Sequence, residues 1–159
     1  LIYPLSEFNP DKYQALIAIG DCQARKEIAK RLPENTQYFS FKHPSAQILN
    51  TATVEIGEGS IICANTIITT DCKIGKHAHL NLGTTIGHDC VIGDYFTTAP
   101  SVSISGNCTI GDCVYFATNS CMREKLSVCS DVTIGMMGAV VKNITESGTY
   151  VGIPAKKIK

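Results

Sequence analysis

A six-residue period runs through most of this 159-residue sequence and limits the folds that it can adopt. From residue 56 to residue 140, every sixth residue is an apolar anchor, with Thr98 the single exception. The residue two positions before each anchor is mostly small or β-branched. A period of six fits neither the roughly 3.6 residues of a helical turn nor a long two-residue alternation. We therefore expect short strands joined by tight turns, with both positions facing inward.

Three such strands close a triangular coil of eighteen residues, so the period predicts a parallel β-helix with coils about 4.8 Å apart. Residues 56–145 supply about five coils, and we expect the β-helix over 44–145. Glycine often follows an anchor, and we expect it to serve turns with unusual backbone angles. Cys72, Cys90 and Cys108 are eighteen apart, which predicts a buried column of small side chains rather than ligands or nucleophiles.

Charge and composition exclude several classes of protein. The 14 basic and 14 acidic side chains cancel, which argues against a surface dedicated to nucleic acid. No apolar run approaches the about 20 residues that a membrane span needs, and no signal-peptide pattern begins at Leu1. Without a secretory signal, the eight cysteines are expected to be reduced thiols in a cytoplasmic protein.

Residues 1–43 lack the period and form a separate N-terminal segment. An apolar run over 13–19 predicts a strand that ends at Gly20, residues 22–32 predict a short helix stopped by Pro33, and residues 37–41 predict a second strand. Such a βαβ fragment is too small to be a stable domain alone. Gly20 lies where ligands bind in open α/β sheets, or it is an ordinary turn glycine.

The sequence repeats one motif in tandem: an aliphatic residue, a glycine directly after it, and a small residue three positions after the glycine. This motif resembles the repeat of the hexapeptide-repeat acyltransferases. The segments 85–94 and 104–111 and the tail 151–156 resemble one branch of them, the bacillosamine-type amino-sugar N-acetyltransferases and the sialic acid O-acetyltransferases. The resemblance implies a mainly β fold, with a left-handed β-helix of about five coils after a partial Rossmann-like fragment. It also implies a homotrimer with the active site at the subunit interface, and acetyl-CoA as co-substrate.

His88 is the candidate general base, because histidine ionises near neutral pH and this residue follows an anchor by two, at a corner. Asp89 beside it is suited to orient the ring. The alternative is a solvated turn histidine. Gly106 is eighteen residues further on and stacks on the same corner, so its backbone N–H lies near the base, unless it is only a turn glycine. The resemblance implies the catalytic role for His88 and Asp89.

The resemblance also assigns binding residues. It places Thr97, Gly106, Thr118 and Met136 at the coenzyme A site, Gly20 on the substrate side, and the tail 146–159 near the coenzyme. Thr97 stands where the family has a second histidine. His79 lies one coil earlier in the same column, and is either a partial substitute or a surface residue.

The predicted function is acetylation of a bacterial sugar, first the amine of a nucleotide-linked 4-amino-4,6-dideoxy sugar in surface-glycan biosynthesis. A sialic acid O-acetyltransferase is the alternative. A non-catalytic structural trimer is another, although an ice-binding face would show a regular threonine column and the outward columns here are mixed. A zinc-dependent hydratase would use His77 and His79, but no third ligand lies in register, so we expect no metal.

Overall fold

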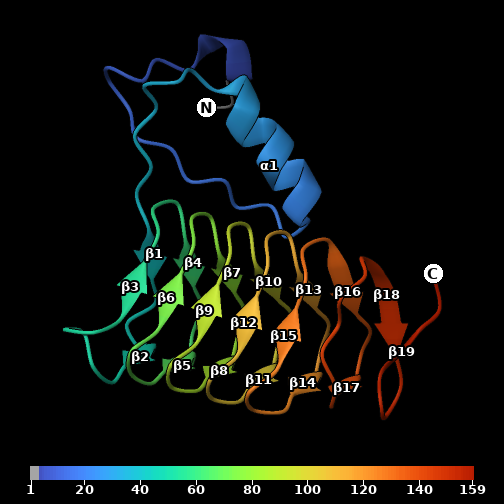
Figure 1. The fold of residues 1–159 in the computed structure, drawn as a ribbon. Coiled ribbons are helices and arrows are strands. Elements are labelled where there is room, and N and C mark those ends of the chain that lie inside the picture. The colour runs from blue at the N-terminus through green and yellow to red at the C-terminus, as the bar shows by residue number, and fades with distance from the viewer. Residues whose placement is uncertain (1–3) are drawn as a thin grey trace.

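The computed structural model describes residues 4–159 and shows a triangular prism of three parallel sheets (Figure 1). The first sheet contains β1 (Phe41–Lys42), β4 (Ile61–Ile62), β7 (His79–Leu80), β10 (Thr97–Thr98), β13 (Tyr115–Phe116), β16 (Val132–Ile134), β18 (Gly148–Val151) and β19 (Lys156–Lys157). The second contains β2 (Gln47–Ile48), β5 (Ile67–Ile68), β8 (Thr85–Ile86), β11 (Ser103–Ile104), β14 (Cys121–Met122) and β17 (Ala139–Val140). The third contains β3 (Glu55–Ile56), β6 (Lys73–Ile74), β9 (Val91–Ile92), β12 (Thr109–Ile110) and β15 (Ser127–Val128).

The parallel β-helix predicted from the period is confirmed, with one more turn than expected. The second sheet has six strands, so the chain makes about six turns. The extra turn lies at the start, where Phe41 pairs with Ile61. That pairing spans twenty residues, whereas Ile61 pairs with His79 over eighteen. The two additional residues in the first turn explain why a strict step of six does not reach it.

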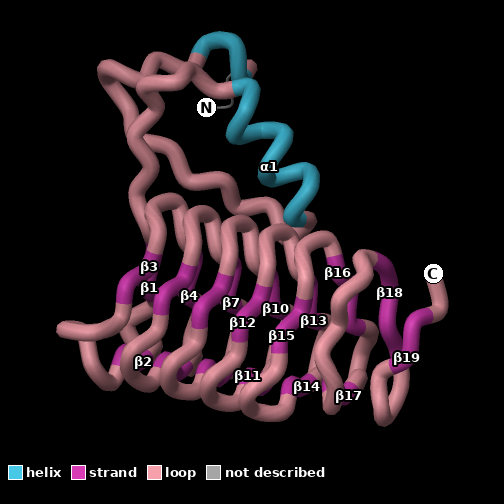
Figure 2. The backbone as a smooth tube through the Cα atoms, viewed as in Figure 1, coloured by secondary structure: helices cyan, strands magenta, loops and turns pink. Residues whose placement is uncertain are grey.

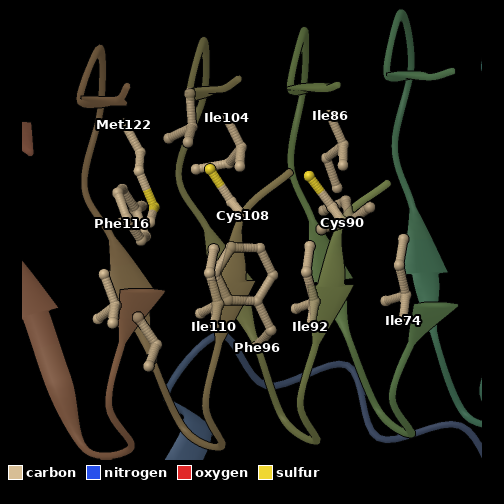
Figure 3. Packing of buried hydrophobic residues seen from close by; sticks show 14 of the residues in the cluster. Ile74, Ile86, Cys90, Ile92, Phe96, Ile104, Cys108, Ile110, Phe116 and Met122 are labelled. Atoms are coloured by element: carbon tan, nitrogen blue, oxygen red, sulfur yellow. The ribbon is translucent and has the colours of Figure 1, made fainter. Parts of the chain in front are cut away.

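The core is a set of columns that run along the prism axis (Figure 3). Cys72, Cys90 and Cys108 are completely buried, as predicted for small inward residues. None of the cysteines in residues 4–159 forms a disulfide. Phe96 and Phe116 pack edge to face within the core, with ring centroids 6.0 Å apart. Each buried aliphatic side chain contributes on the order of 1.5–3 kcal/mol before conformational entropy is subtracted.

The glycine after an anchor serves a different purpose from the predicted one. The left-handed backbone angles lie three residues after the anchor, at residues such as Asp89 and Asn107. A Cβ on Gly57 would lie 2.5 Å from the backbone nitrogen of Lys76 in the next turn. Glycine therefore follows the anchor because successive turns approach too closely there for a side chain, and not because the turn needs unusual angles.

The N-terminal segment lies beside the prism and carries the one long helix of the described chain (Figure 2). It contains the short 3₁₀ helix η1 (Leu5–Glu7) and α1 (Cys22–Arg31). The Asp21 side chain caps α1 by accepting from the Ala24 N–H at 2.7 Å. The two predicted strands are reduced to a single parallel bridge between Ala15 and Tyr38. Residues 1–3 of the expected 1–43 fragment lie outside the described residues. No helix in residues 4–159 is long and apolar enough to cross a membrane.

A hairpin closes the C-terminal end of the first sheet. β18 pairs parallel with β16, as the preceding turns do, but β19 returns antiparallel to β18. The edge strand is the lysine pair Lys156–Lys157, and Lys157 forms an ion pair with Glu146 at 3.0 Å. The coil register therefore ends at this hairpin.

Candidate active site

His88 and Asp89 lie in the turn between β8 and β9, on the corner between the second and third sheets. Nδ1 of His88 is 2.7 Å from Oδ2 of Asp89, and both side chains are more than half exposed. A carboxylate at one ring nitrogen orients the imidazole and leaves Nε2 free for proton transfer. The predicted pairing of these two residues is present in the structure.

Gly106 lies in the next turn of this corner, between β11 and β12, directly against the His88 ring. A Cβ at Gly106 would lie 2.6 Å from Nε2 of His88, so only glycine leaves the ring where it is. We call His88, Asp89 and Gly106 the His88 corner.

The backbone N–H of Gly106 is the second feature of this corner. At the corner between the third and first sheets, the equivalent N–H groups of Lys76 and Asp94 donate to the aspartate of the next turn, each at 2.8 Å. Within residues 4–159, the Gly106 N–H donates to no acceptor. The His88 corner therefore combines an oriented imidazole with a free backbone donor, and these are the groups that acyl transfer requires.

Thr118 and Met136 lie on a different corner, between the first and second sheets. They follow β13 and β16, and the N–H of Met137 donates to the Thr118 carbonyl at 3.0 Å. Met136 is 74% exposed, whereas Thr118 is partly buried. We call these two residues the Met136 corner. The structure stacks them in one column, as the eighteen-residue spacing predicts, but does not place them beside His88.

Gly20 and Thr97 meet in a third place, a cavity of 550 Å³ between the N-terminus of α1 and the first sheet. We call it the α1–β10 cavity. Its lining is Gly20, Asp21, Cys22, Gln23, His79, Asn81, Thr97, Thr98, Ala99, Cys113, Tyr115, Asp131 and Thr133. His79 is the strand-pairing partner of Thr97, so the one-coil relation predicted for these two residues holds. The cavity lies away from the His88 corner of the same chain.

One residue of this region was missed by the sequence analysis. Arg25 of α1 is only 1% exposed and donates to the Thr97 hydroxyl at 2.7 Å. In the sequence it is one of several charged residues of a polar helix, and its partners in the β-helix lie 52 to 72 residues away. No local pattern could have distinguished it from the solvent-exposed Lys30 of the same helix.

Burial and the charge of Arg25 act on the two neighbouring histidines. The pKa of His79 is lowered first by burial and then by the Arg25 charge, and the pKa of His77 is lowered by the same two causes in the same order. Within residues 4–159, no group of three or more histidine, cysteine or acidic side chains is arranged to hold a metal ion.

Comparisons with known proteins show which class of protein shares this architecture. No protein-family model matches the chain. The chain is 35% identical to WeeI from Acinetobacter baumannii, covering 89% of this chain and 68% of WeeI, with a TM-score of 0.83. It is 26% identical to the acetyltransferase domain of PglB from Neisseria gonorrhoeae, covering 97% and 75%, with a TM-score of 0.90. It is 27% identical to PerB from Caulobacter crescentus in complex with coenzyme A and GDP-perosamine, covering 89% and 68%, with a TM-score of 0.84.

These likenesses define the class of protein as an acyltransferase built on a left-handed β-helix. The chain belongs to the hexapeptide-repeat sugar acetyltransferases. The predictions of the fold class, of an acyltransferase and of acetyl-CoA as the acyl donor are confirmed, and the alternative of a non-catalytic structural trimer is set aside. The handedness, which the resemblance alone implied, follows from the same neighbours.

Proposed function

We propose that this chain transfers the acetyl group of acetyl-CoA to the amine of a nucleotide-linked 4-amino-4,6-dideoxy sugar, as a step in surface-glycan biosynthesis. The observation that carries the proposal is the His88 corner, where an imidazole held by a carboxylate lies against a glycine with a free N–H. The choice of acceptor is supported by PerB, a perosamine N-acetyltransferase, which binds GDP-perosamine.

The proposed reaction assigns one task to each group of the corner. Asp89 holds Nδ1 of His88, so that Nε2 can accept a proton from the sugar amine while the amine nitrogen attacks the thioester carbonyl. The Gly106 N–H donates to the carbonyl oxygen as that oxygen gains negative charge. The C–S bond then breaks, the new amide bond remains, and His88 returns the proton to the departing coenzyme A thiolate.

The binding residues complete the proposal. Gly20 and Thr97 hold the acceptor in the α1–β10 cavity, where the N-terminus of α1 favours the phosphates of a nucleotide sugar. In this proposal Thr97 contacts the acceptor, whereas the resemblance implies a contact with the coenzyme. Thr118 and Met136 contact coenzyme A along the prism, near the tail 146–159, and the segment 1–43 serves the sugar nucleotide.

The His88 corner, the Met136 corner and the α1–β10 cavity do not meet within one chain. The cavity lies on the first sheet, and the His88 corner lies between the other two sheets. We therefore propose a homotrimer in which the His88 corner of one protomer faces the cavity of its neighbour. A closed cyclic assembly of this kind repeats one heterologous contact three times.

The test is release of coenzyme A thiol from acetyl-CoA against a panel of acceptors. The panel contains UDP-, dTDP- and GDP-linked 4-amino sugars, free and CMP-linked sialic acid, and serine. Turnover of a nucleotide amino sugar is expected. Turnover of sialic acid alone would replace the proposal with an O-acetyltransferase, and no turnover with any acceptor would refute it.

The variant that tests the mechanism is His88→Ala. Removing a general base is expected to lower kcat by a factor on the order of 10²–10⁴. The melting temperature should change little, because the ring is exposed. His43→Ala is the matched control, since His43 also contacts a neighbouring side chain, Ser45, at 2.9 Å but lies in the first turn. Near-normal turnover in His88→Ala would remove His88 as the base.

A further inference from the structure

Arg25 is a buried cation without a charged partner. Its side chain donates from Nε to the His77 carbonyl at 3.0 Å, from Nη1 to the carbonyls of Ile19 and Gly20, and from Nη2 to the Tyr95 carbonyl at 2.9 Å and the Thr97 hydroxyl at 2.7 Å. All five acceptors are neutral, and no ion pair within residues 4–159 includes Arg25. Burial lowers its pKa from 12.5, but the guanidinium stays protonated near neutral pH.

A buried charge held only by neutral groups costs free energy, so its position needs a reason. The partners of Arg25 show what it joins. Ile19 and Gly20 belong to the N-terminal segment, whereas His77, Tyr95 and Thr97 belong to two successive turns of the β-helix. Because Gly20 and Thr97 both line the α1–β10 cavity, one guanidinium fixes the two walls of that cavity relative to each other.

The charge of Arg25 also acts on His79 in the same cavity. The Nδ1 atom of His79 is buried and has no hydrogen-bond partner within residues 4–159. A buried polar atom without a partner is uncommon, and His79 is one of the residues that line the cavity. The pKa of His79 is lowered from 6.5 by burial and by Arg25, so the ring is neutral at pH 7 and can accept a hydrogen bond at one nitrogen.

The other ionisable groups of the cavity already have partners or remain protonated. Asp21 accepts from the Ala24 N–H at 2.7 Å, and Asp131 accepts from the Gln23 side chain at 2.7 Å. Burial and the nearby Cys22 raise the pKa of Cys113 to about 12, so this thiol is uncharged. The remaining ionisable groups in the lining are Tyr115 and Cys22, and the Cys22 thiol donates to the Cys113 carbonyl at 3.5 Å. Among the residues that the structure describes, Arg25 is therefore the one charged group that lowers the pKa of His79, after burial, which is the larger cause.

We propose that Arg25 is a positioning residue of the α1–β10 cavity, which sets Gly20 against Thr97 beside the His79 ring, so that this ring hydrogen-bonds a hydroxyl of the acceptor sugar. The proposal rests on the proposed function for the identity of the ligand. The effect of the Arg25 charge on the His79 ring is a property of the protein alone.

The first measurement is an NMR titration of the His79 imidazole in the free protein. The midpoint is expected clearly below 6.5 in the unaltered chain and closer to 6.5 in Arg25→Met, which removes the charge but keeps an apolar stem. In Arg25→Lys the midpoint should stay low. An ordinary midpoint in the unaltered chain, or an unchanged one in Arg25→Met, would overturn the proposal. Neither result depends on turnover.

The second measurement separates acceptor binding from catalysis. Both Arg25→Met and Arg25→Lys are expected to raise the acceptor KM at least about tenfold, with kcat and the KM for acetyl-CoA within about threefold, because a lysine cannot make five bonds in a plane. Thr97→Val, which removes one of the five bonds, should give a smaller rise. Lys30→Met is the control, since Lys30 lies on the same helix in an exposed ion pair with Glu27.

The kinetic outcomes also decide between roles. An unchanged acceptor KM in both Arg25 variants would refute the positioning role. Loss of kcat with no change in KM would show that Arg25 only supports the fold. His79→Gln, which retains a neutral hydrogen-bonding group, should keep more of the acceptor affinity than His79→Phe, and equal losses would overturn the role of His79.

Discussion

A single missing side chain shapes the His88 corner. At the corner between the third and first sheets, the side chain of Asp94 reaches back to the N–H of Lys76 in the preceding turn. At the His88 corner, Gly106 has no side chain, and the imidazole of His88 takes that space. At the corner between the third and first sheets this position therefore supplies an acceptor for a backbone N–H, whereas at the His88 corner its glycine leaves room for the imidazole.

Gly106→Ala is the variant that tests this residue. Its Cβ would lie 2.6 Å from Nε2 of His88, at the far end of a side chain that can rotate away, so we expect little loss of stability. Turnover should fall by about 10²-fold or more, because the base moves and the N–H is screened. The readouts are kcat and the melting temperature.

Gly111→Ala is the matched control for that variant. Its Cβ would meet the backbone nitrogen of Ser130 at 2.6 Å, on another corner. It should lower the melting temperature while the folded protein keeps its kcat. If Gly106→Ala retained full turnover, the proposed role of the Gly106 N–H would be wrong.

At the scale of elements, the N-terminal segment is held to the prism by neutral aromatic contacts around a histidine. The His77 ring lies edge-on to Tyr38 at 4.5 Å between centroids and stacks on Tyr95 at 5.1 Å. His77 is 4% exposed, and burial and the Arg25 charge lower its pKa from 6.5. The folded, docked state therefore favours the neutral His77 ring, whereas the same ring would bind a proton more readily once the N-terminal segment has undocked.

This sets the direction of a pH dependence. Because the folded pKa of His77 is the lower one, its contribution to docking is complete above about pH 6.5 and is lost as the pH falls below that value. The protection factors of the α1 amides, which correct for the intrinsic pH dependence of hydrogen exchange, should therefore be lower at pH 5 than at pH 7.5, while the strands of the β-helix stay protected. His77→Phe should reduce this difference, and a pH-independent α1 in the unaltered chain would contradict it.

The sequence predicted the elements well where a period repeats and poorly where contacts are distant. Each anchor ends a strand, so the three faces and the cysteine column could be placed from spacing. Thr98 broke the pattern because its buried hydroxyl accepts from the Asn81 N–H at 2.9 Å and lies 2.7 Å from the Thr84 hydroxyl. Arg25 could not be found, since its role depends on contacts between the helix and turns far along the chain.

At the scale of the whole molecule, the proposed active site is shared between copies. One chain presents the His88 corner and the α1–β10 cavity on different parts of its surface. The candidate residues were predicted from spacing together with the resemblance, whereas the homotrimer was implied by the resemblance alone, because spacing along one chain describes only one protomer.

Mixing two inactive variants tests this arrangement. His88→Ala removes the base, and Gly20→Trp adds a large ring at the cavity, where nothing lies within 4 Å of a Cβ at Gly20. Each alone should be nearly inactive, and trimers reassembled from both should regain a substantial fraction of the activity, because some interfaces then pair two intact halves. Light scattering should give three times the mass of the 17.1 kDa chain. A monomer, or no recovery in mixed trimers, would refute the shared site.

The hairpin of β18 and β19 has a consequence for how this protein behaves at high concentration. A stack of parallel turns offers its last strand as a template, on which another molecule could continue the same pattern into a fibre. Here the template ends in a strand of reversed direction that carries Lys156 and Lys157. An incoming copy meets a strand of the wrong direction at that end of the first sheet, so growth by end-to-end addition is discouraged there.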